Sequence, residues 1–300
     1  MTCIVMDAPP SQEDCGPWLQ VQRCLQDGGV HVPEVLAQDL QQGFLLISDL
    51  GNTPYLAALL HHSIQGGIAK IGALYADASD ALIRIQLCRG HDALPKYDRA
   101  LLLREMRLFP DWYLARHLGM TLSADQGEVL SKAFEQILAV NLGEPRVFVH
   151  RDYHSRNLMA INPSAGVNPG VIDFQDAVHG PISYDLVSLF KDAYIAWEEE
   201  QTLDWLIRYW EKARKSGLPV RSDFGEFHRD YEWMGVQRHL KILGIFARLF
   251  HRDGKDGYLK EMPLVAKYLR LTCERYRGLG PLRKLFDELE NRTVQTGYTF

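Results

Sequence analysis

The chain has 300 residues, of which 46% are hydrophobic and 24% are charged, as in an ordinary soluble globular protein. The formal net charge of -5 disfavours nucleic acid as a partner, because surfaces that bind phosphates usually carry a basic excess. Five scattered cysteines predict neither a disulfide framework nor a zinc site, and no apolar run is long enough for a membrane span or a signal peptide. We therefore expect a reduced, cytoplasmic protein with no membrane or nucleic-acid partner.

The first fifty residues predict a small β-containing lobe. Its helix is expected from Ser11 to Gln26, and three short β-type runs surround it, at 2–6, 33–40 and 43–51. The first run stops before two consecutive prolines, because proline cannot donate a hydrogen bond within a sheet. We expect this lobe, residues 1–50, to end at a hinge near residue 50.

The rest of the chain, residues 51–300, predicts a large and mostly helical lobe. Apolar residues recur with helical spacing over 67–87, and a second helix around 99–118 is disturbed by Pro110. A capping box, Ser-Ala-Asp-Gln beginning at Ser123, opens a third helix. Long helices return towards the end of the chain.

Three polar residues in the interval 146–175 carry the predicted chemistry. The interval contains three short β-type runs, "RVFVH", "NLMAI" and "GVIDF", which predict a β-hairpin inserted among the helices. The first run delivers Asp152, Asn157 follows five positions later, and Asp173 lies sixteen residues further on, on the other hairpin arm. A carboxylate can align a substrate hydroxyl and accept its proton, and amide and carboxylate oxygens are ligands that magnesium prefers. The pattern therefore predicts transfer of a phosphoryl group.

Two other His-Arg-Asp triplets, at 228–230 and 251–253, do not fit this pattern. The required asparagine is replaced by Gly235 after the first of them and by Tyr258 after the second. The stretch "SDFGEFHRDYEW" instead predicts the start of a helix, with Ser222 as its N-cap. We expect this helix to frame the acceptor substrate and not the phosphate.

The segments "HRDYHSRN" and "VIDFQDAVHGPISYDLVSL" resemble the aminoglycoside phosphotransferase family, kinase-like enzymes that use ATP to phosphorylate hydroxyls of small molecules. Within this family, "VMDAPP", "GFLLISDLG", "FPDWYLARHLG" and "YEWMGVQRHLKILGIFARL" are similar to the anomeric sugar kinases of cell-wall recycling. Those enzymes act on the 1-hydroxyl of N-acetylmuramate or N-acetylglucosamine. The resemblance covers nearly the whole chain and implies an α+β, two-lobed, protein-kinase-like fold with ATP and Mg²⁺ as cofactors.

The resemblance also implies roles for individual residues. Asp152 is implied to be the catalytic base and His150 to brace its loop, while Asn157 and Asp173 are implied to bind magnesium. Asp185 is similar to the family's buried acidic residue that anchors the catalytic loop. A carboxylate that only favours a helix N-terminus is the alternative interpretation of Asp185.

On the nucleotide side, the backbone around Ser48, Asp49 and Leu50 is similar to the family's hinge, which hydrogen-bonds adenine. Family members begin with two strands and a phosphate-covering loop before the strand that matches "TCIVMDAPP". We therefore expect the small lobe to lack its first two strands. The matching strand has no lysine for the phosphates, which leaves the source of compensating charge open.

The predicted acceptor site favours an anionic or N-acylated sugar. Such a sugar needs cations or amide donors, whereas a polycationic aminoglycoside needs carboxylates. Arg238 and Lys241 lie three residues apart on a predicted helix and share one face, although a solvated basic face is an equal alternative. Core packing is the alternative interpretation for the two aromatic residues among the further candidates for sugar contacts, which are Glu105, Trp112, Tyr113 and Glu232.

Two other functions stay open at this stage. One is a kinase for another hydroxyl, such as that of an aminoglycoside, a choline-like amine or homoserine. The other is a truncated, nucleotide-binding pseudokinase. A protein kinase is disfavoured, because the chain has no Ala-Pro-Glu segment and "IDFQD" replaces Asp-Phe-Gly. The predicted partners are a small-molecule sugar and a nucleotide, and the sequence does not predict the oligomeric state.

Overall fold

The computed structural model describes residues 2–162 and 166–289. Contacts divide the chain into two compact units, the first formed by residues 1–97 and 145–227 and the second by residues 98–144 and 228–300. The lobe boundary expected at residue 50 stays a prediction. The described residues contain no helix that is long and apolar enough to cross a membrane.

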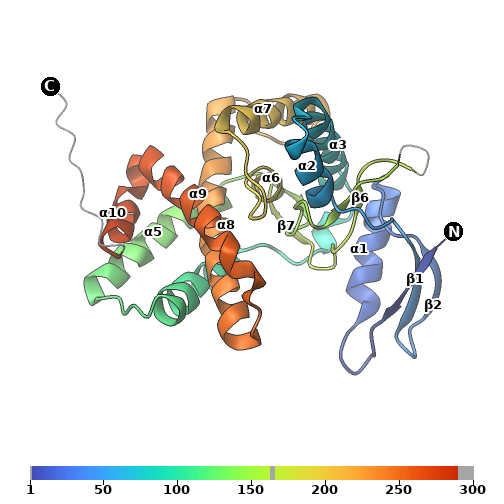
Figure 1. Cartoon of the computed structure of the whole chain (residues 1–300), viewed down its shortest axis with the longest axis horizontal. Coiled ribbons are helices and arrows are strands. Elements are labelled where there is room, and N and C mark those ends of the chain that lie inside the picture. Colours follow the sequence, from blue (N-terminus) through green and yellow to red (C-terminus); the bar gives the residue numbers. More distant parts are fainter. Residues whose placement is uncertain (1, 163–165, 290–300) are drawn as a thin grey trace. The chain divides into compact units, whose positions relative to one another are not determined.

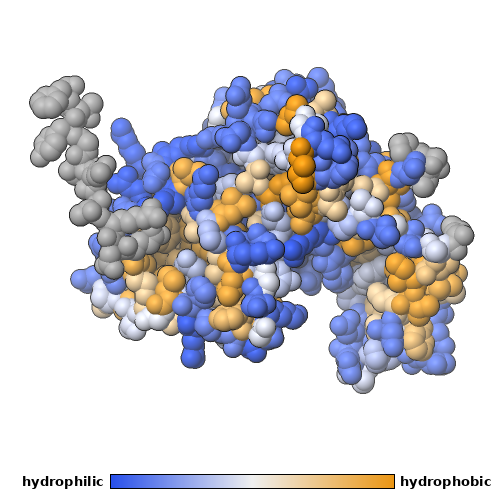
Figure 2. Space-filling view, viewed as in Figure 1, coloured by the Kyte–Doolittle hydropathy of each residue, from blue (hydrophilic) through white to orange (hydrophobic). Residues whose placement is uncertain are grey.

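The first unit begins with a three-stranded antiparallel sheet of order β1-β3-β2, formed by β1 (Cys3–Asp7), β3 (Phe44–Ser48) and β2 (Val35–Asp39). The helix α1 (Cys15–Asp27) packs on this sheet through Leu19, which meets Leu45 and Ile47 (Figure 1). Alternation along β3 sends these two side chains to one face. Other hydrophobic side chains of the sheet, among them those of Val5 and Phe44, are exposed and form an apolar area on its surface (Figure 2).

The helix predicted to start at Ser11 starts four residues later. The Asp14 side chain caps the first turn by accepting a hydrogen bond from the Gly16 N–H at 2.8 Å. Before it, the Pro9 carbonyl accepts hydrogen bonds from the N–H groups of Gln12 and Glu13, so the chain forms a turn there. The Asp14 cap therefore sets the first residue of α1, and the residues that precede Asp14 are not part of the helix.

The middle of the first unit contains two antiparallel strand pairs. One joins β4 (Arg146–Val149) to β7 (Val178–Pro181), and the other is a short hairpin of β5 (Leu158–Met159) and β6 (Gly170–Val171). The three predicted β-type runs are thus confirmed, whereas β7 was missed because "VHGP" has no β-type pattern. A side chain at Gly180 would bring its Cβ to 2.7 Å from the Cβ of Tyr97, so glycine permits the close approach there.

The helices of the first unit are α2 (Tyr55–Ile64), α3 (Ile68–Gln86), α6 (Tyr184–Phe190) and α7 (Glu199–Lys215), with a short 3-10 turn at His91–Ala93. The helix α3 contacts both α2 and α7 (Figure 1). All seven residues of α6 are buried. A helix that is buried on every side is held by tertiary packing and not by its own propensity.

The second unit is helical. It contains α4 (Arg99–Met106), a π-helix at Phe109–His117, α5 (Ala124–Leu142), most of α8 (Phe224–Asp253), 3-10 turns at Asp256–Glu261 and Arg277–Leu279, α9 (Met262–Arg275) and α10 (Gly280–Leu289). The single helix predicted over 99–118 is therefore two helices. Pro110 lies at the start of the second, where its missing N–H breaks no helical hydrogen bond.

Two predicted helix starts have different outcomes. The capping box at Ser123 is confirmed, since its side chain accepts from the Gln126 N–H while the Gln126 side chain accepts from the Ser123 N–H. The helix predicted for "SDFGEFHRDYEW" is also confirmed, as the start of α8. Its cap, however, is Asp223 and not Ser222, because the Asp223 carboxylate accepts from the Glu226 N–H at 2.9 Å.

Candidate active site

The segment 150–157, which we call the catalytic loop, connects β4 to β5 and is anchored at its start by Asp185. The Asp185 carboxylate is fully buried in the first turn of α6. It accepts hydrogen bonds from the backbone N–H of His150 at 2.7 Å and from that of Arg151 at 3.0 Å. A carboxylate that accepts two backbone N–H groups fixes both peptide units in one orientation.

The ring of His150 joins the catalytic loop to the segment after β6. Its Nε2 lies 3.1 Å from the Ile172 carbonyl oxygen, and its Nδ1 accepts from the Asp152 N–H at 3.3 Å. Because Nδ1 accepts a hydrogen bond, the ring proton is on Nε2. Complete burial lowers the pKa of His150 to about 4, so the ring is neutral at pH 7. His150 therefore acts as an uncharged brace beneath Asp152.

Asn157 and Asp173, predicted as neighbours on two hairpin arms, are brought together. The Asn157 Nδ2 donates to Asp173 Oδ2 at 2.9 Å and to the Asp152 backbone oxygen at 3.0 Å. Both N–H bonds of the amide are thus used, which fixes its orientation and leaves Oδ1 as its acceptor atom. Asp173 lies two residues beyond β6, and the Gln175 side chain donates to its other oxygen at 2.8 Å.

Backbone strain marks the same two segments. Arg151 has φ of 77° and Asp173 has φ of 64°, and among residues 2–162 and 166–289 these are the only residues other than glycine with positive φ. Side chains with a Cβ rarely adopt this region, and such strain gathers at functional sites, where the surrounding structure enforces it. Here the enforcing contacts include the two Asp185 hydrogen bonds and the Asn157–Asp173 hydrogen bond.

Two cavities lie beside these residues within the first unit. The larger, of about 560 Å³, is lined by Asn157, Asp173 and Asp176 together with parts of β1 and α1. The smaller, of about 240 Å³, is lined by the predicted hinge residues, Ser48, Asp49 and Leu50, together with β5 and the segment after β6. Trp18, Ile172 and Asp173 line both cavities, so the two adjoin.

Two residues of this region, Asp192 and Trp18, were not predicted from the sequence as part of the site. Asp192 is buried and accepts hydrogen bonds from the Ser155 N–H at 2.9 Å and from the Tyr194 N–H at 3.0 Å, so it anchors the middle of the catalytic loop. A charged residue within the apolar run "SLFKDAYIAW" was the available signal. Trp18 lines both cavities and packs on Phe174, with ring centroids 5.2 Å apart.

The predicted acceptor-site residues all lie in the second unit. Three of them are buried together, Glu105 on α4 and both Arg238 and Lys241 on α8. Lys241 is buried and its Nζ lies 3.2 Å from the Glu105 carboxylate. The Gln237 amide also donates to Glu105 at 3.2 Å, and Arg238 is likewise buried. Lys241 therefore belongs to an ion pair within a polar cluster and not to a solvated basic face.

The remaining acceptor-site candidates have other partners within the second unit. Glu232 is buried and accepts from the Arg275 guanidinium at 2.8 Å. Tyr113 is half-buried and stacks with Phe109, at 5.3 Å between ring centroids, and with His117. Trp112 is half-buried on the same π-helix. Packing accounts for Tyr113 and an ion pair for Glu232.

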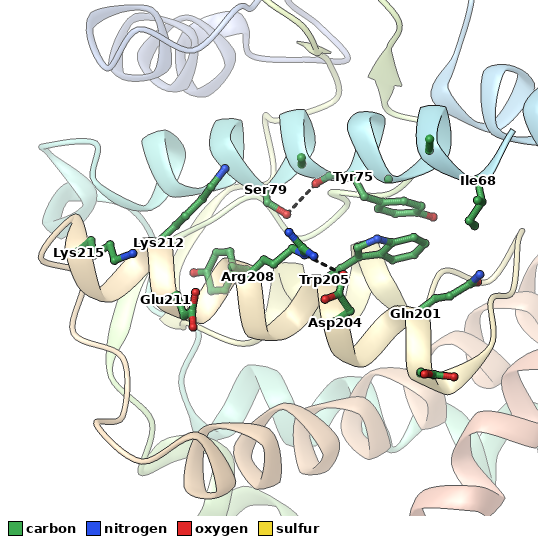
Figure 3. Close-up of a pocket in the computed structure, with 15 residues that line it drawn as sticks. Ile68, Tyr75, Ser79, Gln201, Asp204, Trp205, Arg208, Glu211, Lys212 and Lys215 are labelled. Carbon is green, nitrogen blue, oxygen red and sulfur yellow. Dashed lines mark hydrogen bonds and ion pairs between the residues drawn. The ribbon is translucent and has the colours of Figure 1, made fainter.

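A further cavity, of about 810 Å³, lies between α3 and α7 of the first unit and contains none of the predicted site residues (Figure 3). Tyr75 and Trp205 stack at its base, with centroids 4.2 Å apart. Charged residues on its rim pair with acidic neighbours, as Arg208 does with Asp204 at 2.8 Å.

Comparison with known proteins adds independent information. The sequence profile described as "Phosphotransferase enzyme family" matches residues 2–223. The chain is 48% identical over 298 residues to an N-acetylmuramate/N-acetylglucosamine kinase of Neisseria meningitidis serogroup B, covering 99% of this chain and 86% of that protein. It is also 48% identical, over 286 residues, to the N-acetylmuramate/N-acetylglucosamine kinase of Pseudomonas aeruginosa, covering 95% of this chain and 81% of that protein.

Among solved structures, an ADP-bound aminoglycoside phosphotransferase is similar with a TM-score of 0.52 and 18% identity, covering 84% of this chain and 80% of that one. At this identity the likeness shows the fold alone, and it confirms the expected α+β, protein-kinase-like class. Together with the profile match over residues 2–223, these similarities show that the chain belongs to the phosphotransferase enzyme family.

Proposed function

We propose that the chain is an ATP- and Mg²⁺-dependent kinase that phosphorylates the anomeric hydroxyl of an amino sugar, N-acetylmuramate or N-acetylglucosamine, in peptidoglycan recycling. The observation that carries this proposal is the 48% identity, over nearly the whole chain, to kinases named for these two sugars. The geometry around Asp152 agrees with it, because a candidate base and two metal-type oxygen donors lie on one rigid framework. We also infer a cytoplasmic location, where ATP is supplied and where the five free thiols would stay reduced.

The two adjoining cavities suggest how the nucleotide is bound. We infer that adenine occupies the smaller one, where the backbone of Ser48, Asp49 and Leu50 offers amide and carbonyl groups in the manner of a hinge. The phosphates then lie in the larger one, towards Asn157 and Asp173. Trp18, which lines both, would contact the nucleotide between its two ends.

Asn157 and Asp173 fit a magnesium ion. Magnesium is usually held by one or two protein oxygens together with substrate phosphates, so two oxygen donors suffice. The amide of Asn157 is fixed by its two donated hydrogen bonds, which leaves Oδ1 as a ligand beside the Asp173 carboxylate. When bound, the ion neutralises charge on the phosphates.

Asp152 has the role of base in this mechanism. Its backbone N–H is held by His150 and its carbonyl by Asn157, so the peptide on both sides of its side chain is fixed. The carboxylate aligns the sugar hydroxyl and accepts its proton as the oxygen attacks the γ-phosphorus. Because its ring is neutral, His150 places no positive charge next to this carboxylate.

We further propose that the polar cluster of Glu105, Gln237, Arg238 and Lys241 recognises the sugar substituents. Gln237 Oε1 is buried and has no hydrogen-bond partner among the described residues, and an acetamido N–H would satisfy it. Lys241 and Arg238 bring cationic side chains to the cluster, and cations suit the lactyl carboxylate of N-acetylmuramate. We also propose sugar contacts for Trp112, Tyr113 and Glu232, of which Tyr113 stacks on neighbouring rings and Glu232 pairs with Arg275.

A double substitution tests the cluster without leaving a buried charge alone. Glu105→Gln with Lys241→Met removes both members of the ion pair, and we expect KM for N-acetylmuramate to rise about 10-fold while KM for N-acetylglucosamine changes by less than about 3-fold. The exposed pair Arg99–Glu135 of the same unit gives the matched control, Glu135→Gln with Arg99→Met. If KM changed equally for the two sugars, the Glu105–Lys241 ion pair would contribute to folding and not to recognition of N-acetylmuramate.

The proposed function is tested by an acceptor panel with labelled ATP. We expect phosphate transfer to N-acetylmuramate and N-acetylglucosamine, and nuclear magnetic resonance of the product should show the phosphate on the anomeric oxygen. The panel includes an aminoglycoside, choline and homoserine, because these acceptors represent the alternative kinases. Transfer to one of them and not to the amino sugars would reject the proposal. Nucleotide binding without transfer to any acceptor would favour a pseudokinase.

A further inference from the structure

The cavity assigned to the phosphates has an excess of negative charge. Its walls include the carboxylates of Glu13, Asp14, Asp173 and Asp176, and its lining residues include neither lysine nor arginine. The strand β1, which contributes Met6 to the same wall, also lacks a lysine. Phosphoryl transfer spreads negative charge over three oxygens, and positive charge from the protein normally offsets it. Apart from the proposed magnesium ion, any compensating positive charge of the protein must therefore come from residues outside these walls.

The sequence between His150 and Asp176 offers two permanently charged cations, Arg151 and Arg156. Arg151 supports the framework, because its guanidinium lies 3.4 Å from the Asp176 carbonyl oxygen and 5.6 Å from the Tyr97 ring centroid. Its backbone is the strained position fixed by Asp185. Arg156, by contrast, lies along the sequence between Asp152, the proposed base, and Asn157, the proposed metal ligand that directly follows it.

Arg156 is held by a buried support. The centre of its guanidinium lies 3.8 Å from the centroid of the Tyr194 ring, a cation–π distance. The Tyr194 N–H donates to one oxygen of buried Asp192, and the Ser155 N–H donates to the other. One carboxylate thus fixes the residue before Arg156 and also the residue whose ring Arg156 covers. A guanidinium stacked by its face presents its N–H donors at its edge, where they can meet phosphate oxygens.

We propose that Arg156 is a further catalytic residue, which donates hydrogen bonds to the non-bridging oxygens of the phosphoryl group during transfer. This inference rests on the proposed kinase function. The sugar oxygen forms a bond to the γ-phosphorus while the bond from that phosphorus to the bridging oxygen breaks, and the electron pair leaves with ADP. The hydroxyl proton passes to Asp152. Arg156 takes no part in making or breaking bonds, and its positive charge offsets the negative charge of the phosphoryl group in transfer. Asp192 and Tyr194 are positioning residues, which hold the Arg156 guanidinium in place.

The test compares Arg156→Gln, Arg156→Lys and Arg156→Ala with the unchanged protein. We expect Arg156→Gln to lower kcat about 100-fold or more with both amino sugars, while the Kd of the nucleotide from calorimetry changes by less than about 3-fold. Arg156→Lys should recover only part of the loss, since a point charge replaces a planar donor. Added methylguanidinium should raise the rate of Arg156→Ala, a rescue that a purely structural role would not give. Arg208→Gln, which changes an exposed arginine on α7, is the matched control.

Each outcome either supports or overturns the assignment. Equal loss of kcat with both sugars, with rescue by methylguanidinium, supports it. A loss confined to N-acetylmuramate and expressed in KM would mean that Arg156 binds the sugar carboxylate and would overturn it. Unchanged kcat, or a loss without rescue, would also overturn it. If the unchanged protein transfers no phosphate to any acceptor, the kinase function fails first, so the two failures are distinguishable.

Discussion

Replacing Asp152 with Asn is expected to lower kcat about 1000-fold while the Kd of the nucleotide stays within about 2-fold. A positioned general base contributes roughly 100- to 10000-fold to a rate, and the amide of Asn cannot accept the proton of the sugar hydroxyl. The substitution keeps the shape of the loop, because the hydrogen bonds that fix residue 152 to His150 and Asn157 use its backbone N–H and C=O. Steady-state assays with calorimetry measure both quantities.

The chain supplies its own control for this substitution. Asp253 ends another His-Arg-Asp triplet, lies exposed at the end of α8, and pairs with Arg252 at 2.7 Å. Asp253→Asn should leave both kcat and the nucleotide Kd unchanged. If Asp152→Asn instead weakened nucleotide binding at unchanged kcat, Asp152 would belong to the nucleotide or metal site and another group would be the base.

Asp185→Ala is expected to lower the free energy of unfolding by about 2–4 kcal/mol and to lower kcat with it. The substitution removes the acceptor of two backbone N–H groups, those of His150 and Arg151, in a buried position, and each unsatisfied buried donor costs about 1–3 kcal/mol. It also releases the strained φ of Arg151, so the catalytic loop loses its fixed course. Urea unfolding followed by circular dichroism measures the loss of stability.

Two comparisons make this prediction specific. Asp204→Ala removes an exposed carboxylate on α7 and should change the free energy of unfolding by less than about 1 kcal/mol. Asp152→Asn should keep the stability of the unchanged protein although its kcat falls. An Asp185→Ala variant with full stability and full kcat would reduce Asp185 to an ordinary residue of a helix N-terminus.

The sequence predicted the parts of the site whose geometry is set by short spacing. Asp152 and Asn157 are five residues apart and lie on the same loop. Asn157 and Asp173 are sixteen residues apart, and the hairpin between them brings their side chains to 2.9 Å. Capping chemistry similarly located the helix that follows Ser123. In each case the interacting groups lie within one local element, so the pattern alone decides which of them meet.

Features that depend on distant segments escaped prediction. The strand β7 has no β-type pattern and exists because β4 pairs with it. Asp192 anchors Ser155, which is 37 residues away, and no local spacing indicates that contact. Lys241 was predicted to share an acceptor-site face with Arg238, and no local spacing indicated its ion pair with Glu105, which comes from another helix. Such pairings are decided by how helices and strands pack, and they become visible only in three dimensions.

The catalytic loop donates hydrogen bonds to two carboxylates at opposite ends of α6. Asp185 lies in the first turn of this helix, and Asp192 lies just beyond the last turn. The helix therefore works as a spacer of fixed length. An inserted residue turns a helix by about 100° and would withdraw one of the two carboxylates from the loop. Amino-acid exchanges can accumulate along α6 and the loop independently, but a change in the number of residues in one requires a matching change in the other. Insertions and deletions should therefore be tolerated in the surface turns of this chain and absent from both segments.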